Sequence, residues 1–190
     1  MPDIFVIGGP NGAGKSTTAR EMLPAFIGCV EFVNADDIAH GLSAFRPETV
    51  AFEAGRAMLN RLHELARQRV DFAFETTLAS RSFAPWLKER HSEGFGVHVI
   101  YLWLPSPELA VARVARRVEA GGHNVAEAVI RRRYERGRKH FLELYAPLAD
   151  TWAIYDNSGF EPYLVAFGGR DEPTTILESE NWRSIIKDIQ

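Results

Sequence analysis

A glycine-rich stretch near the start of the chain has the residue types and spacing of a phosphate-binding loop. Residues 4–18 read IFVIGGPNGAGKSTT, and the pattern G-x-x-x-x-G-K-S begins in it at Gly9. Glycines allow positive φ angles, so that successive backbone N–H groups can turn toward phosphate oxygens. We predict that Lys15 reaches the β- and γ-phosphates of ATP and that Ser16 ligates Mg²⁺. The predicted nucleotide-binding residues are Gly9, Pro10, Asn11, Gly12, Ala13, Gly14, Lys15, Ser16 and Thr17.

Two carboxylates follow predicted strands and are candidates for the chemistry itself. Asp36 follows the apolar run that begins at Val30, and Glu75 stands at the end of the run that begins at Asp71. In open α/β sheets ligands bind beyond the carboxyl ends of the strands, where both side chains are expected. We predict Asp36 as the general base for an acceptor hydroxyl and Glu75 as a ligand of Mg²⁺ or its water. The predicted substrate-binding residues are Asp36, Glu75, Thr76 and Thr77.

The sequence leaves alternatives open for these carboxylates. Glu75 could bind a substrate hydroxyl instead of the metal, as acidic residues in kinases do. Asp36 and Asp37 could both be acids in the first turn of a helix, and we expect Asp37 to be the N-cap of the short helix that follows.

Arginines are concentrated between Arg113 and Lys139. Nine basic and three acidic residues give this segment a net charge of +6, so the rest of the chain carries −9. The segment predicts two helices joined by a glycine hinge, with Asn124 as the cap of the second helix. We expect a lid over about residues 113–139 whose guanidinium groups stabilise the transferring phosphoryl group; a solvated helix face is the alternative for each arginine. The predicted catalytic arginines are Arg117 with Arg132 or Arg133.

Apolar strands alternate with amphipathic helices along the chain, and these elements must position the candidate residues. The alternation predicts an α/β fold of the P-loop NTPase type. We expect a three-layer sandwich with a mostly parallel sheet of five to six strands, flanked by helices, with a small helical lid. Residues 1–168 are expected to form one kinase domain, with an edge strand at its end, and residues 169–190 a C-terminal tail that forms no separate domain.

Composition argues against several other classes of protein. The chain has 190 residues, 46% of them hydrophobic, which suits a single domain with a substantial core. Its apolar runs are shorter than the ~18 residues of a membrane span, so we expect a cytoplasmic protein without membrane partners. Cys29 is the single cysteine, so no internal disulfide can form. Zinc-ligand spacing is missing, and no structural metal is expected.

Six strings, taken in order, make the chain resemble a short zeta-toxin-type P-loop kinase. They are GPNGAGKST, FVNADDIAHGL, FAFETTL, RVARRVEAGGHNV, IRRRYERG and YDNSG, and they are distributed over residues 4–160. The resemblance implies a parallel sheet flanked by helices, and transfer of the ATP γ-phosphoryl group to the 3′-hydroxyl of UDP-N-acetylglucosamine. It implies a general-base aspartate at Asp36, the loop lysine at Lys15 and lid arginines between Arg113 and Arg136. The resemblance also implies an antitoxin protein as a candidate partner.

These features together predict an ATP-dependent kinase. It would move the γ-phosphoryl group of ATP to a hydroxyl of a small molecule, for which a UDP-N-acetylsugar is a candidate, with ATP and Mg²⁺ as cofactors. One alternative is a nucleotide-hydrolysing switch or ATPase that acts on a protein partner, although the LSGGQ-like signature of transporters is missing. Another is a nucleic-acid-binding P-loop protein. The acidic remainder of the chain and the lack of interleaved aromatics argue against it, so no nucleic-acid partner is expected.

Overall fold

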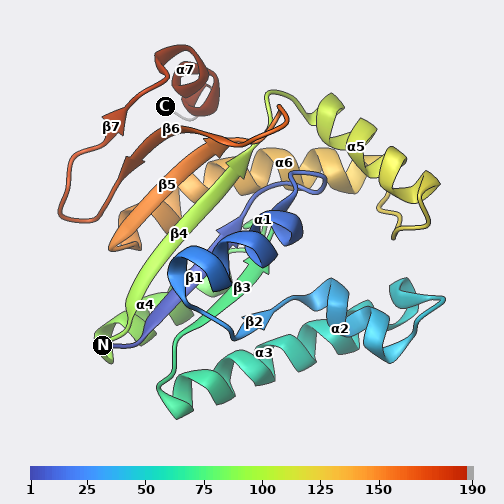
Figure 1. The fold of residues 1–190 in the computed structure, drawn as a ribbon, viewed down its shortest axis with the longest axis horizontal. Coiled ribbons are helices and arrows are strands. Elements are labelled where there is room, and N and C mark those ends of the chain that lie inside the picture. Colours follow the sequence, from blue (N-terminus) through green and yellow to red (C-terminus); the bar gives the residue numbers. More distant parts are fainter. Residues whose placement is uncertain (188–190) are drawn as a thin grey trace.

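A seven-stranded sheet forms the centre of the computed structural model, which describes residues 1–187 apart from the side chain of Phe26 (Figure 1). The strand order is β2-β3-β1-β4-β5-β6-β7. The first five strands in this order are parallel, whereas β6 and β7 run antiparallel to their neighbours. The strands are β1 Asp3–Gly8, β2 Phe32–Val33, β3 Phe72–Thr76, β4 Gly96–Trp103, β5 Thr151–Asp156, β6 Tyr163–Gly168 and β7 Thr175–Ile176.

Helices pack on both faces of the sheet (Figure 1). Ile4 and Val6 of β1 belong to the large core cluster that also contains residues of α3 and α4, because alternate residues of a strand point to opposite faces. Ile7 packs on the other face with Ala19 of α1. The helices are α1 Lys15–Met22, α2 Ala35–Leu42, α3 Ala51–Gln68, α4 Phe83–Ser92, α5 Pro107–Glu119, α6 Glu127–His140 and α7 Ser179–Ile186.

This arrangement confirms the predicted fold class, an α/β sandwich of the P-loop type with a mostly parallel sheet. The sheet is wider than expected, since it has seven strands where the sequence predicted five to six. The additional strand, β7, has two exposed residues, too few for a periodic pattern. It pairs with β6, so β6 is not the edge strand that the sequence predicted.

Residues after β6 pack against the sheet and belong to the same core. Ile185 of α7 is buried in the large core cluster, and Trp182 stacks on Trp152 of β5 with ring centroids 6.1 Å apart. Asn181 donates a hydrogen bond to the buried carboxylate of Asp156. Packing of this amphipathic helix against the antiparallel end of the sheet gives residues 175–186 a regular structure.

Two predicted helix caps are wrong. The cap of α2 is Asn34, whose Oδ1 accepts a hydrogen bond of 2.8 Å from the backbone N–H of Asp36, because Asn34 is the last extended residue before the helix. Asp37 lies inside the first turn and forms an ion pair with Arg20 at 3.0 Å. Helix α6 begins at Glu127 after Ala126 and has no side-chain cap, so Asn124 lies before the helix.

Within the part of the chain that the structure describes, no helix combines the length and the apolar composition needed to cross a membrane.

Helix α6 is held close to the end of β3 through a glycine. A Cβ atom built on Gly137 would overlap the carbonyl oxygen of Thr77, so the helix approaches the strand more closely than an alanine allows. The hydroxyl of Tyr134, on the same helix, donates to the carbonyl of Leu104 at 2.6 Å. Burial raises the pKa of Tyr134 to about 12, so the hydroxyl stays a neutral donor at physiological pH. These contacts fix the position of the basic helix over the sheet.

We expect Gly137→Ala to lower the free energy of unfolding by about 1–3 kcal/mol, because overpacking against a backbone oxygen displaces the helix. Gly55→Ala is the matched control, since Gly55 also lies in a helix and its added Cβ would meet no atom within 4 Å. That substitution should stabilise the protein by up to about 1 kcal/mol through helix propensity. Urea unfolding of both variants checks the difference, and equal stability of the two variants would contradict the close approach.

Candidate active site

The glycine-rich loop connects the end of β1 to the start of α1, as the sequence predicted. Gly9, Gly12 and Gly14 have φ angles of 143°, 80° and 81°, which L side chains rarely adopt. A Cβ atom on Gly9 would also overlap the carbonyl oxygen of Leu102. The first N–H groups of α1 have no partners within the helix and, with the helix dipole, favour an anion at this end.

A cavity of about 240 Å³ lies over this loop and is here called the nucleotide cavity. Most of the predicted nucleotide-binding residues line it, whereas Gly9, Pro10 and Ala13 lie behind it and shape the turn. Ala13 is fully buried against α5. The lining residues are Asn11, Gly12, Gly14, Lys15, Ser16, Thr17, Asp36, Glu75, Arg113 and Arg117.

Lys15 and Glu75 form an ion pair at the floor of the nucleotide cavity. The Lys15 Nζ lies 3.5 Å from Glu75 Oε1 and donates a 3.0 Å hydrogen bond to the carbonyl of Pro10. Both side chains are largely buried, with exposed fractions of 6% and 11%. The ammonium group is therefore held at the loop, in reach of an anion bound there.

Ser16 and Glu75 offer oxygen ligands next to each other. The Ser16 hydroxyl donates to Glu75 Oε2 at 2.6 Å, and the Asn34 amide donates to the same carboxylate oxygen at 2.9 Å. Mg²⁺ prefers such hard oxygen donors, and it is usually held by one or two protein groups together with substrate phosphates and water. The donor set therefore fits Mg²⁺ bound together with a nucleotide.

Asp36 lies where two cavities meet. It lines the nucleotide cavity and a second cavity of about 220 Å³, here called the acceptor cavity. Asp36 is exposed, and among residues 1–187 its carboxylate takes part in no hydrogen bond or ion pair. Asn34, as the cap of α2, fixes the backbone of Asp36. The carboxylate is thus free to accept a proton from a ligand in the acceptor cavity.

The acceptor cavity brings together the predicted substrate-binding residues. Thr76 is the last residue of β3 and Thr77 follows it; the next residue, Leu78, has a φ angle of 55°, which is uncommon for a residue other than glycine. The Thr76 hydroxyl accepts a hydrogen bond from the N–H of Leu78 and so supports this turn. The lining residues are Asn11, Lys15, Asn34, Ala35, Asp36, Met58, Glu75, Thr76, Thr77, Phe83 and Arg133.

The three arginines predicted to be catalytic lie in three different environments. Arg117 of α5 lines the nucleotide cavity, and its guanidinium donates to the carbonyl of His123 at 2.9 Å. Arg133 of α6 lines the acceptor cavity, where its Nη1 lies 3.4 Å from Asn11 Oδ1. Arg132 is exposed and lines none of the cavities described for residues 1–187. Neighbouring positions on a helix point about 100° apart, which separates Arg132 from Arg133.

The sequence interpretation missed Asn34, and it included Arg113 only as one of the arginines of the predicted lid. Asn34 joins Ser16 and Glu75 to the helix of Asp36, and Arg113 lines the nucleotide cavity. Asn157 donates from its amide to the carbonyl of Ala13 at 2.6 Å, so the turn after β5 supports the glycine-rich loop. Arg113 holds this turn through hydrogen bonds to the carbonyls of Asn157 and Ser158. Asn34 stands two residues before Asp36, which is the one local signal that pointed to it.

Asp156, at the end of β5, lines neither the nucleotide cavity nor the acceptor cavity. This carboxylate is 2% exposed and accepts hydrogen bonds from Tyr163 and Asn181. The hydrogen bond to Asp156 raises the pKa of Tyr163, so the tyrosine remains a neutral donor. Asp156 therefore connects the sheet to the C-terminal helix.

We expect Asn34→Ala to lower the free energy of unfolding by about 1–2 kcal/mol, because it removes a helix cap and a buried donor to Glu75. Thr49→Ala is the control, since it removes an exposed hydroxyl that bonds only its own turn at Arg46 and should cost less than about 0.5 kcal/mol. Chemical denaturation measures both changes. A loss at Asn34 no greater than that at Thr49 would show that the network does not stabilise the fold.

Solved structures of a two-protein complex, a toxin-antitoxin system and a kinase share this fold. The structure of AvrRxo1-ORF1:-ORF2 with ATP superposes with a TM-score of 0.75 over 97% of the chain at 17% identity, and the chain spans 63% of that protein's length. The structure from the PezAT toxin-antitoxin system of Streptococcus pneumoniae gives a TM-score of 0.66 at 18% identity, covering 99% of this chain and 80% of that one. Shikimate kinase from Acinetobacter baumannii with shikimate gives 0.50 at 20% identity, covering 99% and 95%.

Sequence comparison gives the family. An uncharacterized protein of Haemophilus influenzae is 32% identical over 126 residues, which cover 66% of this chain and 88% of that protein. The sequence model of a family described as an AAA domain matches residues 4–143, from β1 through the basic helix α6. The matched range contains the glycine-rich loop, both carboxylates and the arginines of both cavities, and the chain therefore belongs to this AAA domain family, with a P-loop, kinase-like fold.

Proposed function

We propose that the protein is an ATP-dependent kinase that transfers the γ-phosphoryl group of ATP to a hydroxyl of a small molecule. One observation carries the proposal: Asp36, whose carboxylate has no partner among residues 1–187, lines both the nucleotide cavity and the acceptor cavity. Lys15, Glu75 and Asn11 also line both cavities, so the two spaces meet at the end of the glycine-rich loop. A phosphoryl group held at the loop and a hydroxyl held by Asp36 would face each other across this junction.

Different residues of the chain bind the phosphates and activate the acceptor hydroxyl. The loop amides and Lys15 bind the phosphates and hold them in position, and positioning supplies much of the catalysis in phosphoryl transfer. Asp36 accepts a hydrogen bond from the acceptor hydroxyl and takes its proton as the new P–O bond forms and the bond to the ADP oxygen breaks. The proton thus moves from the acceptor oxygen to the Asp36 carboxylate.

Ser16 and Glu75 would hold Mg²⁺, Ser16 directly and Glu75 through water. When bound, the ion supplies positive charge next to the β- and γ-phosphate oxygens. Asn34 donates to Glu75 and accepts from the N–H of Asp36, so it ties the metal ligands to the helix that carries the base.

The segment of about residues 113–139, α5 with α6, would act as the lid over the site. Figure 1 shows the turn between these helices on the same side of the molecule as α2. Arg117 on this segment already faces the nucleotide cavity. Its guanidinium would stabilise charge on the transferring phosphoryl oxygens.

The zeta-toxin resemblance supports two finer proposals. A UDP-N-acetylsugar is the first acceptor to test, because transfer to UDP-N-acetylglucosamine is what the resemblance implies. An antitoxin is the protein partner to test, because a structure from the PezAT toxin-antitoxin system has this fold. AvrRxo1-ORF1 likewise forms a complex with ORF2.

Incubation with γ-labelled ATP, Mg²⁺ and a pool of metabolites that includes UDP-sugars tests the kinase proposal. We expect a small molecule to gain a mass of one phosphoryl group, and mass spectrometry identifies it. Release of inorganic phosphate alone, with every metabolite unchanged, would contradict the proposal and favour an ATPase acting on a protein partner.

A further inference from the structure

We propose that the acceptor carries an anionic group, a carboxylate or a phosphate, and that Arg133 binds this group. The inference rests on the proposed function for one point only, that the second cavity receives the acceptor. It adds the chemical class of the ligand and the residue that selects it.

Among the charged residues that line the acceptor cavity, one cation has no carboxylate partner in the part of the chain that the structure describes. Four charged side chains face it, and two of them, Lys15 and Glu75, form an ion pair at 3.5 Å. Arg133 forms no ion pair with a carboxylate among residues 1–187; its described polar contact is the 3.4 Å hydrogen bond to Asn11 Oδ1. Asp36 is also unpaired there. The cavity thus offers one free carboxylate, which suits a hydroxyl, and one free guanidinium, which suits an anion.

The position of Arg133 is fixed by the packing of α6. Gly137 lies one turn further along the same face of the helix, in close contact with the backbone of Thr77, which lines the cavity. Arg133 is half-buried, so part of its hydration is lost. A guanidinium with a fixed fork of donors and no counter-ion is a favourable binding site for carboxylate or phosphate oxygens.

The remaining lining residues indicate a compact, polyhydroxylated molecule. Thr77 lines the cavity together with Thr76, and its hydroxyl has no hydrogen-bond partner among the described residues. Met58 and Phe83 add an apolar wall. The volume of about 220 Å³ is below the roughly 300–1,000 Å³ of sites that enclose drug-sized ligands. A sugar acid or sugar phosphate would fit inside, whereas a nucleotide sugar would keep its base outside.

Another role for Arg133 is contact with the transferring phosphoryl group, which the sequence predicted. The two roles differ in what they change. An anion-binding residue controls acceptor affinity without any turnover, whereas a residue that stabilises the phosphoryl group controls the rate. Equilibrium binding of acceptors therefore separates them.

The experiment measures binding of four probes to the full chain by calorimetry, with Mg²⁺ and a non-hydrolysable ATP analogue. The probes are glucose, glucuronate, glucose 6-phosphate and UDP-N-acetylglucosamine, which are neutral or carry a carboxylate, a phosphate or a diphosphate. We expect at least one anionic probe to bind at least about tenfold more tightly than glucose, as a charge-assisted hydrogen bond gives. The preferred probe identifies the source of the anion.

Variants of the same helix give the controls. Arg133→Gln should remove the tenfold preference, and Arg133→Lys should restore part of it, because lysine keeps the charge without the fork. Lys139→Gln removes an exposed charge from α6, where Lys139 pairs with Glu143, and should leave the preference unchanged. Three results would overturn the proposal: glucose binds as tightly as the anionic probes, no anionic probe binds, or the preference for an anionic probe over glucose persists in Arg133→Gln.

Failure of this inference and failure of the kinase proposal are distinguishable. Selective anion binding that depends on Arg133, without phosphoryl transfer, would support the binding site and count against the kinase. Phosphorylation of a neutral acceptor, with turnover unaffected by Arg133→Gln, would support the kinase and overturn the anion site.

Discussion

Replacement of Lys15 by alanine is expected to abolish ATP-dependent phosphorylation, a loss of at least about 10³-fold in rate. The Lys15 side chain is 6% exposed at the floor of the nucleotide cavity, and no other lysine among residues 1–187 lines this cavity. Its removal takes away the cation that would neutralise the β- and γ-phosphates, in a site where low exposure to water strengthens charge interactions. Transfer of label from γ-labelled ATP measures the loss.

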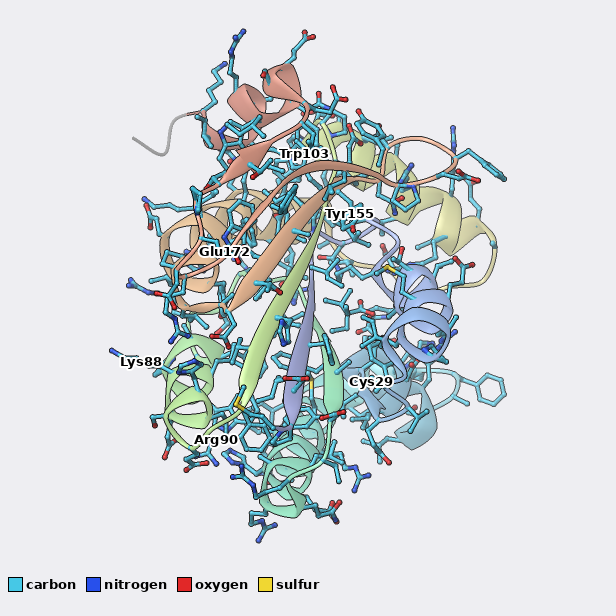
Figure 2. The ribbon with its side chains drawn as sticks, turned by 60° about the vertical axis from the view of Figure 1, so that its left-hand side comes forward. Cys29, Lys88, Arg90, Trp103, Tyr155 and Glu172 are labelled. Carbon is cyan, nitrogen blue, oxygen red and sulfur yellow. The ribbon has the colours of Figure 1, made fainter. Side chains whose placement is uncertain are left out.

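Lys88→Ala is the control for Lys15→Ala. Lys88 extends from α4 into solvent, and it is exposed (Figure 2). It lines neither the nucleotide cavity nor the acceptor cavity, so its removal should leave the rate within about twofold. A thermal melt of each variant shows whether the fold survives. A folded Lys15→Ala protein that keeps its rate would show that the loop lysine does not take part in the reaction.

Asp36→Asn is expected to leave ATP affinity within about threefold and to lower turnover by about 10² or more, the range for loss of a general base. Asparagine has the size of aspartate but cannot take the proton of the acceptor hydroxyl. The side chain is exposed and unpaired among residues 1–187, so the fold should not change. Binding of a fluorescent ATP analogue and steady-state turnover together measure the two effects.

The neighbouring residue provides a matched control for Asp36→Asn. Asp37 is exposed on the same turn of α2, where it pairs with Arg20, and it lines neither the nucleotide cavity nor the acceptor cavity. Asp37→Asn should therefore keep normal turnover, because an exposed ion pair contributes little. Equal losses in the two variants would indicate a general effect of charge on α2, and unchanged turnover in Asp36→Asn would refute the assignment of the base.

Local sequence was sufficient to predict the glycine-rich loop and the position of Glu75 at the end of β3, whereas Asp36 lies with Asp37 in the first turn of α2, as the alternative interpretation had it. The loop spacing fixes both the backbone turn and the direction of Lys15 and Ser16, so no distant contact is needed to interpret it. Glu75 follows from the rule that parallel strands end at one edge of the sheet, since β3 lies next to β1. The roles of these residues in catalysis remain predictions for the variants above.

Contacts between distant parts of the chain explain what could not be predicted. The assignment of Arg117 to one cavity and Arg133 to the other depends on how α5 and α6 cross the sheet, and no pattern along either helix encodes that. Asn157 supports Ala13 across 144 residues of sequence. In the sequence, Asn34 is a polar residue after a strand with no further signal. Its role depends on Ser16 and Glu75, which the fold brings next to it.

The C-terminal helix was missed for a related reason. Helix α7 has eight residues, and its place in the fold comes from Trp182 and Ile185 packing on the sheet. So short a segment has little helical stability of its own in water, which makes its sequence pattern weak.

The destination of the γ-phosphoryl group tests the central claim most directly. ATP labelled with ¹⁸O at the γ-phosphate is incubated with wild-type protein, Mg²⁺ and candidate acceptors, and mass spectrometry follows the label. We predict that the label appears in an organic phosphate ester, and that Asp36→Asn reduces this ester by about 10² or more while ATP stays bound. Label found entirely in inorganic phosphate, or an equal yield of ester from the Asp36→Asn protein, would contradict a kinase in which Asp36 activates the acceptor.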